Sequence, residues 1–173
     1  MVRLIPWTSR NWTFDAAVGT FPALLERLRG TPARAADLVA GASDALLSGR
    51  PDNTWSVKQH IGHLDDLHEL DERRITEFVA GAATLSAADM TNRRTHAADH
   101  NTVPADVLVI RFRTRRAALV ERMDALTEEQ VGATAIHPRL GRPMRLIDWA
   151  CFVAEHDDHH LAAARRAMRL LAG

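Results

Sequence analysis

This 173-residue sequence has a single cysteine, no tyrosine and no excess of charge of either sign. Its one cysteine, Cys151, excludes an intrachain disulfide and a metal site built on several thiolates, and it is typical of a reducing compartment. The 22 lysines and arginines balance 22 aspartates and glutamates, so the basic excess that is typical of nucleic-acid-binding proteins is missing. We therefore expect a protein that does not bind nucleic acid.

Long apolar runs are missing as well. No stretch approaches the roughly 20 apolar residues that a membrane-spanning helix needs. Residues 1–12 contain no apolar core of the kind that marks a secretory signal. Together with the single thiol, these absences predict a cytoplasmic protein with no membrane partner.

Good helix formers dominate what is present. Alternating β-branched runs are few, whereas alanine, leucine, arginine and glutamate are abundant. The length is most simply that of one domain, residues 1–173. Four amphipathic segments predict an all-α fold, a four-helix bundle of the up-and-down type with short extra helical turns. These segments cover residues 15–29, 56–80, 104–126 and 145–171.

Capping and helix-breaking residues mark where these predicted helices begin and end. The sequences SVKQ at 56–59 and TEEQ at 127–130 fit the capping-box pattern that begins a helix. Gly30, Thr31 and Pro32 predict a break in the first helix, followed by a short helix to about residue 40. Residues 82–101 are expected to be irregular, and residues 136–143 are expected to form a loop.

The histidines of the last predicted helix are the strongest functional signal. His156 and His160 are four residues apart, so on a helix they project from one face. Helical periodicity places both near the centre of an apolar arc, between Trp149 and Val153. Imidazoles in an apolar interior are costly unless something satisfies them, and a metal ion does so directly. The pattern therefore predicts that these two histidines bind a metal ion.

A firm metal site needs a third protein ligand. The predicted helix at 56–80 carries His60, His63 and His68, and all three fall within or at the edge of its apolar arc. Periodicity alone does not choose between them.

Two motifs of the chain resemble those of a known family. The sequence WSVKQ at 55–59, followed by HLDDLH at 63–68, resembles the first motif of the DinB/YfiT-like superfamily. The sequence AEHDDHHLA at 154–162 resembles its last motif, H-x-x-H-H. Residues 137–144 are similar to the loop that precedes the final helix in this family. The resemblance spans the chain from about residue 14 to its C-terminus.

The resemblance implies a four-helix bundle with a three-histidine metal site on its inner face. It assigns the ligands to His63, His156 and His160. His60 stands where the family more usually has an apolar residue, and we expect it beside the site or in the core. His68 is expected to reach substrate or to be a buried structural residue. Members of the family are described as metal-dependent hydrolases or resemble transferases that use bacillithiol or mycothiol, and a homodimer is implied as well.

Three functions are open for such a site. A metal ion on three neutral imidazoles can activate water, as in a hydrolase, or hold a low-molecular-weight thiol, as in an S-transferase. Both enzymes would act on a small molecule. The alternative is a non-catalytic, metal-stabilised helical binding module, in which the ion ties two helices together. Zinc suits three nitrogen ligands best, with nickel, iron and manganese as the other candidates.

The remaining polar residues carry weaker predictions. Asp157 lies in the apolar arc, where its carboxylate is expected either to hold a ligand imidazole or to pair with an arginine. Asp66 is expected to lie in solvent. His96, His100 and His137 fall in expected loops and carry no predicted role. An arginine is a natural ligand for an anionic substrate, but the sequence singles out neither that arginine nor a catalytic acid or base.

Overall fold

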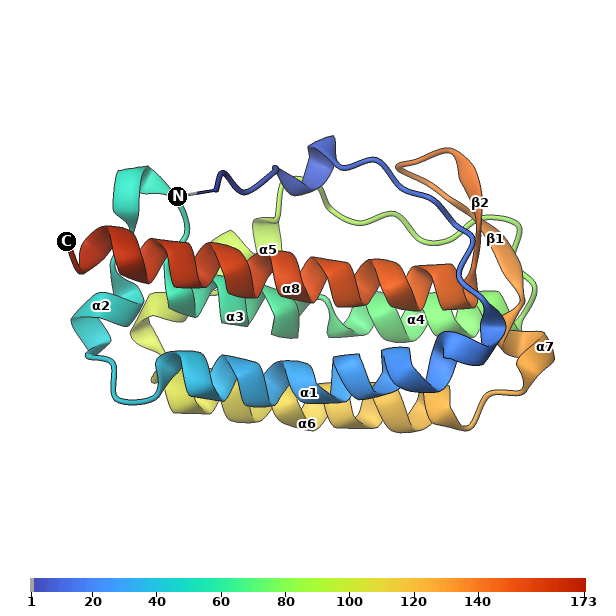
Figure 1. Cartoon of the computed structure of the whole chain (residues 1–173), viewed down its shortest axis with the longest axis horizontal. Helices are drawn as coiled ribbons and strands as arrows, with labels where there is room; N and C mark the ends of the chain where they lie inside the picture. The colour runs from blue at the N-terminus through green and yellow to red at the C-terminus, as the bar shows by residue number, and fades with distance from the viewer. Residues whose placement is uncertain (1) are drawn as a thin grey trace.

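The computed structural model describes residues 2–173, and its long helices pack side by side as a bundle (Figure 1). The four rods of this bundle are α1 (Phe21–Val39), α3 (Val57–Asp66) continued by α4 (His68–Val79), α6 (Ala105–Asp124) and α8 (Leu146–Leu171). The shorter elements are η1 (Trp7–Ser9), η2 (Val18–Thr20), α2 (Asp44–Ser48), η3 (Pro51–Asn53), α5 (Arg93–Ala97), η4 (His100–Thr102), α7 (Glu128–Val131), β1 (Thr134–His137) and β2 (Arg142–Arg145). The predicted all-α four-helix bundle is confirmed. No helix within residues 2–173 has the length and apolarity that crossing a membrane requires.

The order of the rods in space brings the second and last of them together. Helix α1 packs against α6 and α8, and α3 packs against the same two helices. The connection at residues 80–104 runs back along the bundle, so that α6 points in the same direction as α4 (Figure 1). The expected up-and-down order, in which successive helices alternate in direction, is therefore not kept between these two rods. Helices α3 and α8 are thus neighbours, although 79 residues lie between the end of α3 at Asp66 and the start of α8 at Leu146.

Helix α1 continues through the residues that predict a break. It begins at Phe21, later than expected, and contains Pro32 in its interior. An interior proline removes one helical hydrogen bond and crowds the preceding turn. Leu28, Thr31, Pro32 and Ala35 are all buried, however, and their packing against α6 and α8 offsets that loss. The predicted break at 30–32 was therefore wrong.

The structure also differs from the prediction in the helix at 56–80 and in the loop at 136–143. The predicted helix at 56–80 is two helices that meet at Leu67, whose backbone stays close to helical values (φ −77°, ψ −11°). The expected loop at 136–143 forms most of an antiparallel hairpin, in which Thr134 pairs with Arg145 and His137 with Arg142. Both capping boxes are confirmed, with Ser56 and Thr127 as the capping residues.

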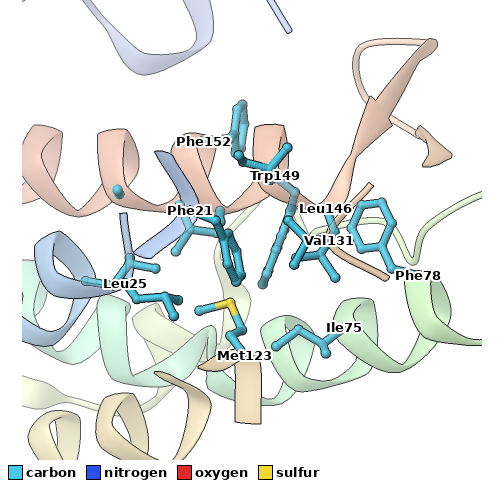
Figure 2. Packing of buried hydrophobic residues seen from close by; sticks show 14 of the residues in the cluster. Phe21, Leu25, Ile75, Phe78, Met123, Val131, Leu146, Trp149 and Phe152 are labelled. Atoms are coloured by element: carbon cyan, nitrogen blue, oxygen red, sulfur yellow. The ribbon is translucent and has the colours of Figure 1, made fainter. Parts of the chain in front are cut away.

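Two apolar clusters fill the bundle. The larger one lies where α1, α4, α6 and α8 meet near the hairpin, and it contains the fully buried Trp149 (Figure 2). The smaller one joins α1, α3, α6 and the far part of α8. On α8 the two clusters leave a gap between Ala154 and Ala164, and His156 and His160 lie in this gap.

Candidate metal centre

Three histidines from two rods meet inside the bundle. His63 comes from α3, and His156 and His160 come from α8. One ring nitrogen of each lies within 4.8 Å of the others, and Nε2 of His156 is 3.1 Å from Nε2 of His160. The helices produce this arrangement directly, because the i,i+4 spacing on α8 faces the inner side of α3.

The geometry of these nitrogens fits a shared metal ion. Two nitrogens bound to one tetrahedral zinc at about 2.0–2.1 Å are separated by roughly 3.3 Å. The 3.1 Å between the two α8 imidazoles is close to that separation. The remaining nitrogen, on His63, lies within 4.8 Å of both. The donor set, three imidazoles, is one that zinc and related ions accept.

His60 lies beside the cluster and contacts one of its members. Its Nδ1 is 2.9 Å from Nδ1 of His160. The contact uses the ring nitrogen of His160 that faces away from His156, because Nε2 of His160 faces Nε2 of His156. The hydrogen bond to His60 therefore orients His160 with Nε2 inward. His68 is not part of the cluster.

A chain of buried polar groups holds His63 in the same way. Nδ1 of His63 lies 2.9 Å from the hydroxyl of Thr95, which donates to Oδ2 of Asp66 at 2.9 Å. Nε2 of His100 lies 2.9 Å from the same carboxylate oxygen. If every donor points toward Asp66, Nδ1 of His63 carries the proton and Nε2 is left free as a metal ligand.

This chain corrects two expectations from the sequence. Asp66 was expected in solvent, but it is buried beneath α5 and η4, and the hydrogen bonds from His100 and Thr95 lower its pKa although burial alone would raise it. His100 was assigned no role, but it is 1% exposed and packs on Gly62 of α3. The sequence carried no local signal for either residue, because both contacts come from the long connection at 80–104.

Burial keeps the inner imidazoles neutral. It lowers the pKa of His63 from its ordinary value of 6.5 to about 4 and that of His60 to about 3. The same cause, helped by the neighbouring imidazoles, lowers the pKa values of His156 and His160 well below 6.5. Neutral imidazole is the form that binds metals, so the site is prepared for an ion at pH 7 without loss of a proton.

A cavity of about 450 Å³ adjoins the three histidines. This volume is within the range of small-molecule sites. All three members of the cluster, His63, His156 and His160, contribute to its wall. Much of the remaining wall is apolar and includes Trp7, Trp55, Leu67, Leu70, Phe152 and Val153.

The N-terminal segment closes one side of this cavity. It runs alongside α8, on the side away from α1 and α6 (Figure 1). The ring of Trp7 packs edge-on against Phe152 and His156, with centroid separations of 4.8 and 4.9 Å. An ion pair of 3.1 Å between Arg10 and Glu155 fixes the segment to α8. No pattern within residues 2–12 predicts that this segment reaches the site, because its contacts are with α8 at the far end of the chain.

Charged residues also line the cavity. Asp157, for which two partners were open, pairs with Arg116 at 3.0 Å, and both side chains are almost fully buried. Asp71 also lines the cavity, and burial raises the pKa of its carboxyl to about 7. Cys151 does not line the cavity, and burial raises the pKa of its thiol. The reactive thiolate form is therefore disfavoured, and Cys151 is not a candidate nucleophile.

Fold and site together define a helical-bundle protein with a three-histidine cluster on its inner face, next to a cavity. The chain belongs to the DinB superfamily, whose family model matches residues 27–164. No curated protein matches the chain in sequence.

Among the solved structures that share the fold are two with named functions. YfiT from Bacillus subtilis, named as a probable metal-dependent hydrolase with an unusual four-helix bundle topology, superposes with a TM-score of 0.82 at 18% identity and covers 94% of each chain. The mycothiol-dependent maleylpyruvate isomerase has a TM-score of 0.64 at 12% identity, over 86% of this chain and 62% of its own. At these identities the similarity establishes the shared fold alone.

Proposed function

We propose that this protein is a metal-dependent enzyme that holds a divalent ion on His63, His156 and His160 and acts on a small molecule in the adjoining cavity. The observation that carries the proposal is the convergence of three neutral imidazoles from α3 and α8 at the wall of a 450 Å³ cavity. When bound, the ion supplies a Lewis acid that makes water or a thiol a stronger nucleophile at neutral pH. Zinc is the ion that we expect, on the basis of three nitrogen ligands.

The chain's own residues would prepare the site and move a proton. Thr95 and His60 hold two of the ligand rings in place through hydrogen bonds. Asp71 is suited to take a proton from the nucleophile, because its carboxyl lines the cavity and its raised pKa lies near neutral pH. The apolar wall excludes water from the part of the cavity that would hold the substrate.

Two reactions fit this arrangement. Hydrolysis is supported by the fold shared with YfiT, a probable metal-dependent hydrolase. Transfer to a low-molecular-weight thiol, such as mycothiol or bacillithiol, is supported by the fold shared with the mycothiol-dependent isomerase. We propose the cytoplasm as the site of action and a homodimer as a candidate assembly.

The non-catalytic alternative, a metal-stabilised binding module, differs in a measurable way. An ion that only ties α3 to α8 would be closed to solvent, whereas the three histidines here adjoin a cavity. Removal of a structural ion should unfold the chain. Removal of a catalytic ion should abolish turnover and leave the helical circular dichroism signal largely unchanged.

The test is a turnover assay on protein loaded separately with zinc, nickel, iron or manganese. One arm measures hydrolysis of a panel of small esters and amides, and the other measures addition of mycothiol or bacillithiol to an electrophile such as 1-chloro-2,4-dinitrobenzene. The proposal expects metal-dependent turnover in one arm, its loss in His156→Ala and its retention in His68→Ala. Turnover that survives in His156→Ala, or is missing from both arms for all four metals, counts against it.

A further inference from the structure

The cavity contains a guanidinium group that the protein itself does not use. Three arginines line it, and two of them are engaged. Nε and Nη2 of Arg74 donate to the carbonyl of Ser86 at 3.0 and 2.8 Å, and Arg116 is paired with Asp157. Within residues 2–173, Arg139 has no hydrogen-bond or ion-pair partner, and its Nη2 is buried.

Such a group is costly unless something outside the chain pairs with it. Arg139 is half-buried, and its buried Nη2 has lost its hydration without gaining a hydrogen bond from the protein. The cost shows in its pKa, which burial lowers. A protein that binds an anion at this point would recover that free energy, so the unpaired nitrogen indicates a ligand.

Arg139 is also held in place. It stands in the turn of the β1–β2 hairpin, where the amides of Leu140 and Gly141 both donate to the carbonyl of His137, at 3.2 and 2.8 Å. Its guanidinium carbon lies 5.7 Å from the centre of the Phe152 ring, which is itself part of the cavity wall. Packing against an aromatic ring restricts the side chain while leaving the edges of the guanidinium plane free for hydrogen bonds.

The surroundings indicate a carboxylate with an apolar body. A guanidinium edge matches the two oxygens of a carboxylate. One carboxylate satisfies both the single positive charge of the guanidinium and its two parallel donors. Leu67, Leu70 and Phe152 offer apolar contact to the rest of such a molecule.

We propose that Arg139 binds the carboxylate of a small, partly apolar substrate and positions it beside the three-histidine cluster. This inference rests on the proposed function, since it takes the cavity to be the substrate site. Among the carboxyl groups that line the cavity, Asp71 forms no ion pair within residues 2–173. Its pKa of about 7 means that about half of the molecules carry it protonated at pH 7, so its repulsion of a bound anion is reduced.

The test measures binding rather than turnover. Isothermal titration calorimetry compares 3-phenylpropionate with its neutral analogue 3-phenylpropionamide, using both zinc-loaded and chelator-treated protein. In chelator-treated protein the acid has no metal ion to bind, so a preference for the acid reports the arginine. We expect the wild type to bind the acid at least about tenfold more tightly than the amide, as a charge-assisted bidentate pair allows.

Three variants separate this proposal from the metal site. Arg139→Gln should remove the preference for the acid and keep the wild-type zinc content, whereas Arg139→Lys should keep part of the preference because it retains the charge but not the planar fork. Arg113→Gln, on the exposed face of α6, is the matched control and should bind as the wild type does. An equal affinity for acid and amide in the wild type, including no binding of either, overturns the proposal, as does Arg139→Gln with an unchanged preference. A wild-type protein that does not bind zinc would instead overturn the proposed function. The preference for the acid over the amide in chelator-treated protein would still test Arg139.

Discussion

Gly62 is the residue at which a single methyl group should disturb both the fold and the metal centre. A Cβ atom placed on it would lie 2.3, 2.4 and 2.5 Å from three atoms of the His100 ring. Ordinary contacts are 3.4 Å or longer, so Gly62→Ala requires the ring to move by about 1 Å. His100 is 1% exposed and its Nε2 lies 2.9 Å from Asp66, so the ring has no free space and its hydrogen bond is lost.

The size of the effect follows from three contributions. Overpacking of a buried site costs about 1–3 kcal/mol. An unsatisfied buried partner of the lost hydrogen bond costs a further ~1–3 kcal/mol. Alanine in place of glycine inside a helix returns roughly 1 kcal/mol. We therefore expect Gly62→Ala to lower the free energy of unfolding by about 1–5 kcal/mol. Because Asp66 then holds Thr95 and His63 less firmly, metal binding should weaken about tenfold or more.

Gly30→Ala is the matched control. Gly30 is also inside a helix, but a Cβ atom there meets nothing within 4 Å. The same substitution should therefore stabilise the protein by about 0.5–1 kcal/mol and leave metal affinity unchanged. Urea unfolding of both variants gives the stabilities, and competition with a fluorescent zinc chelator gives the affinities. A Gly62→Ala protein that is as stable as Gly30→Ala and binds zinc as the wild type does would refute the reasoning.

Three further predictions concern the residues around the site. Metal-free protein should lose stability as the pH falls from 6.5 toward 4, because the pKa of His63 is about 4 in the folded state and near 6.5 in the unfolded state. At about 1.4 kcal/mol for each tenfold change in proton affinity, His63 alone should lower the free energy of unfolding by about 3 kcal/mol. A free energy of unfolding in urea that stays constant over this pH range would contradict the prediction. Thr95→Val should weaken zinc binding by about 10- to 100-fold, while Thr114→Val on the exposed face of α6 should not. Asp71→Asn should lower turnover by roughly 10²- to 10⁴-fold without changing zinc content. In the wild type, a base with a pKa of about 7 makes the rate rise through pH 7, and the variant should not show this rise. An unchanged pH profile would exclude Asp71 as the base.

Local patterns were sufficient for the four rods of the bundle and for two of the three histidines of the cluster. The i,i+4 spacing of His156 and His160, combined with the apolar arc of α8, follows from sequence because both depend on one helix. The capping boxes at Ser56 and Thr127 are likewise local, and both are present. His63 needed the family resemblance, since periodicity left three histidines of one predicted helix as candidates.

Contacts between distant segments are what the sequence could not supply. Thr95 and His100 reach the site only because the connection at 80–104 folds back over α3, and Asp66 is buried for the same reason. Pro32 is tolerated because the packing of α1 compensates for its missing amide. The hairpin is short, with four residues in each strand, so polar and apolar residues alternate over too short a stretch to predict a strand. Part of its pairing is with Thr84 and Leu85 of the same connection, which are distant in sequence.

The central claim is that imidazoles of α3 and α8 share one divalent ion. Elemental analysis of protein purified without added chelator tests it directly, with His63→Ala, His156→Ala and His160→Ala beside the wild type and His68→Ala as the control. The account predicts about one equivalent of a divalent metal in the wild type and in His68→Ala, and a large loss in each of the other three. Metal bound equally well by those three variants would contradict it.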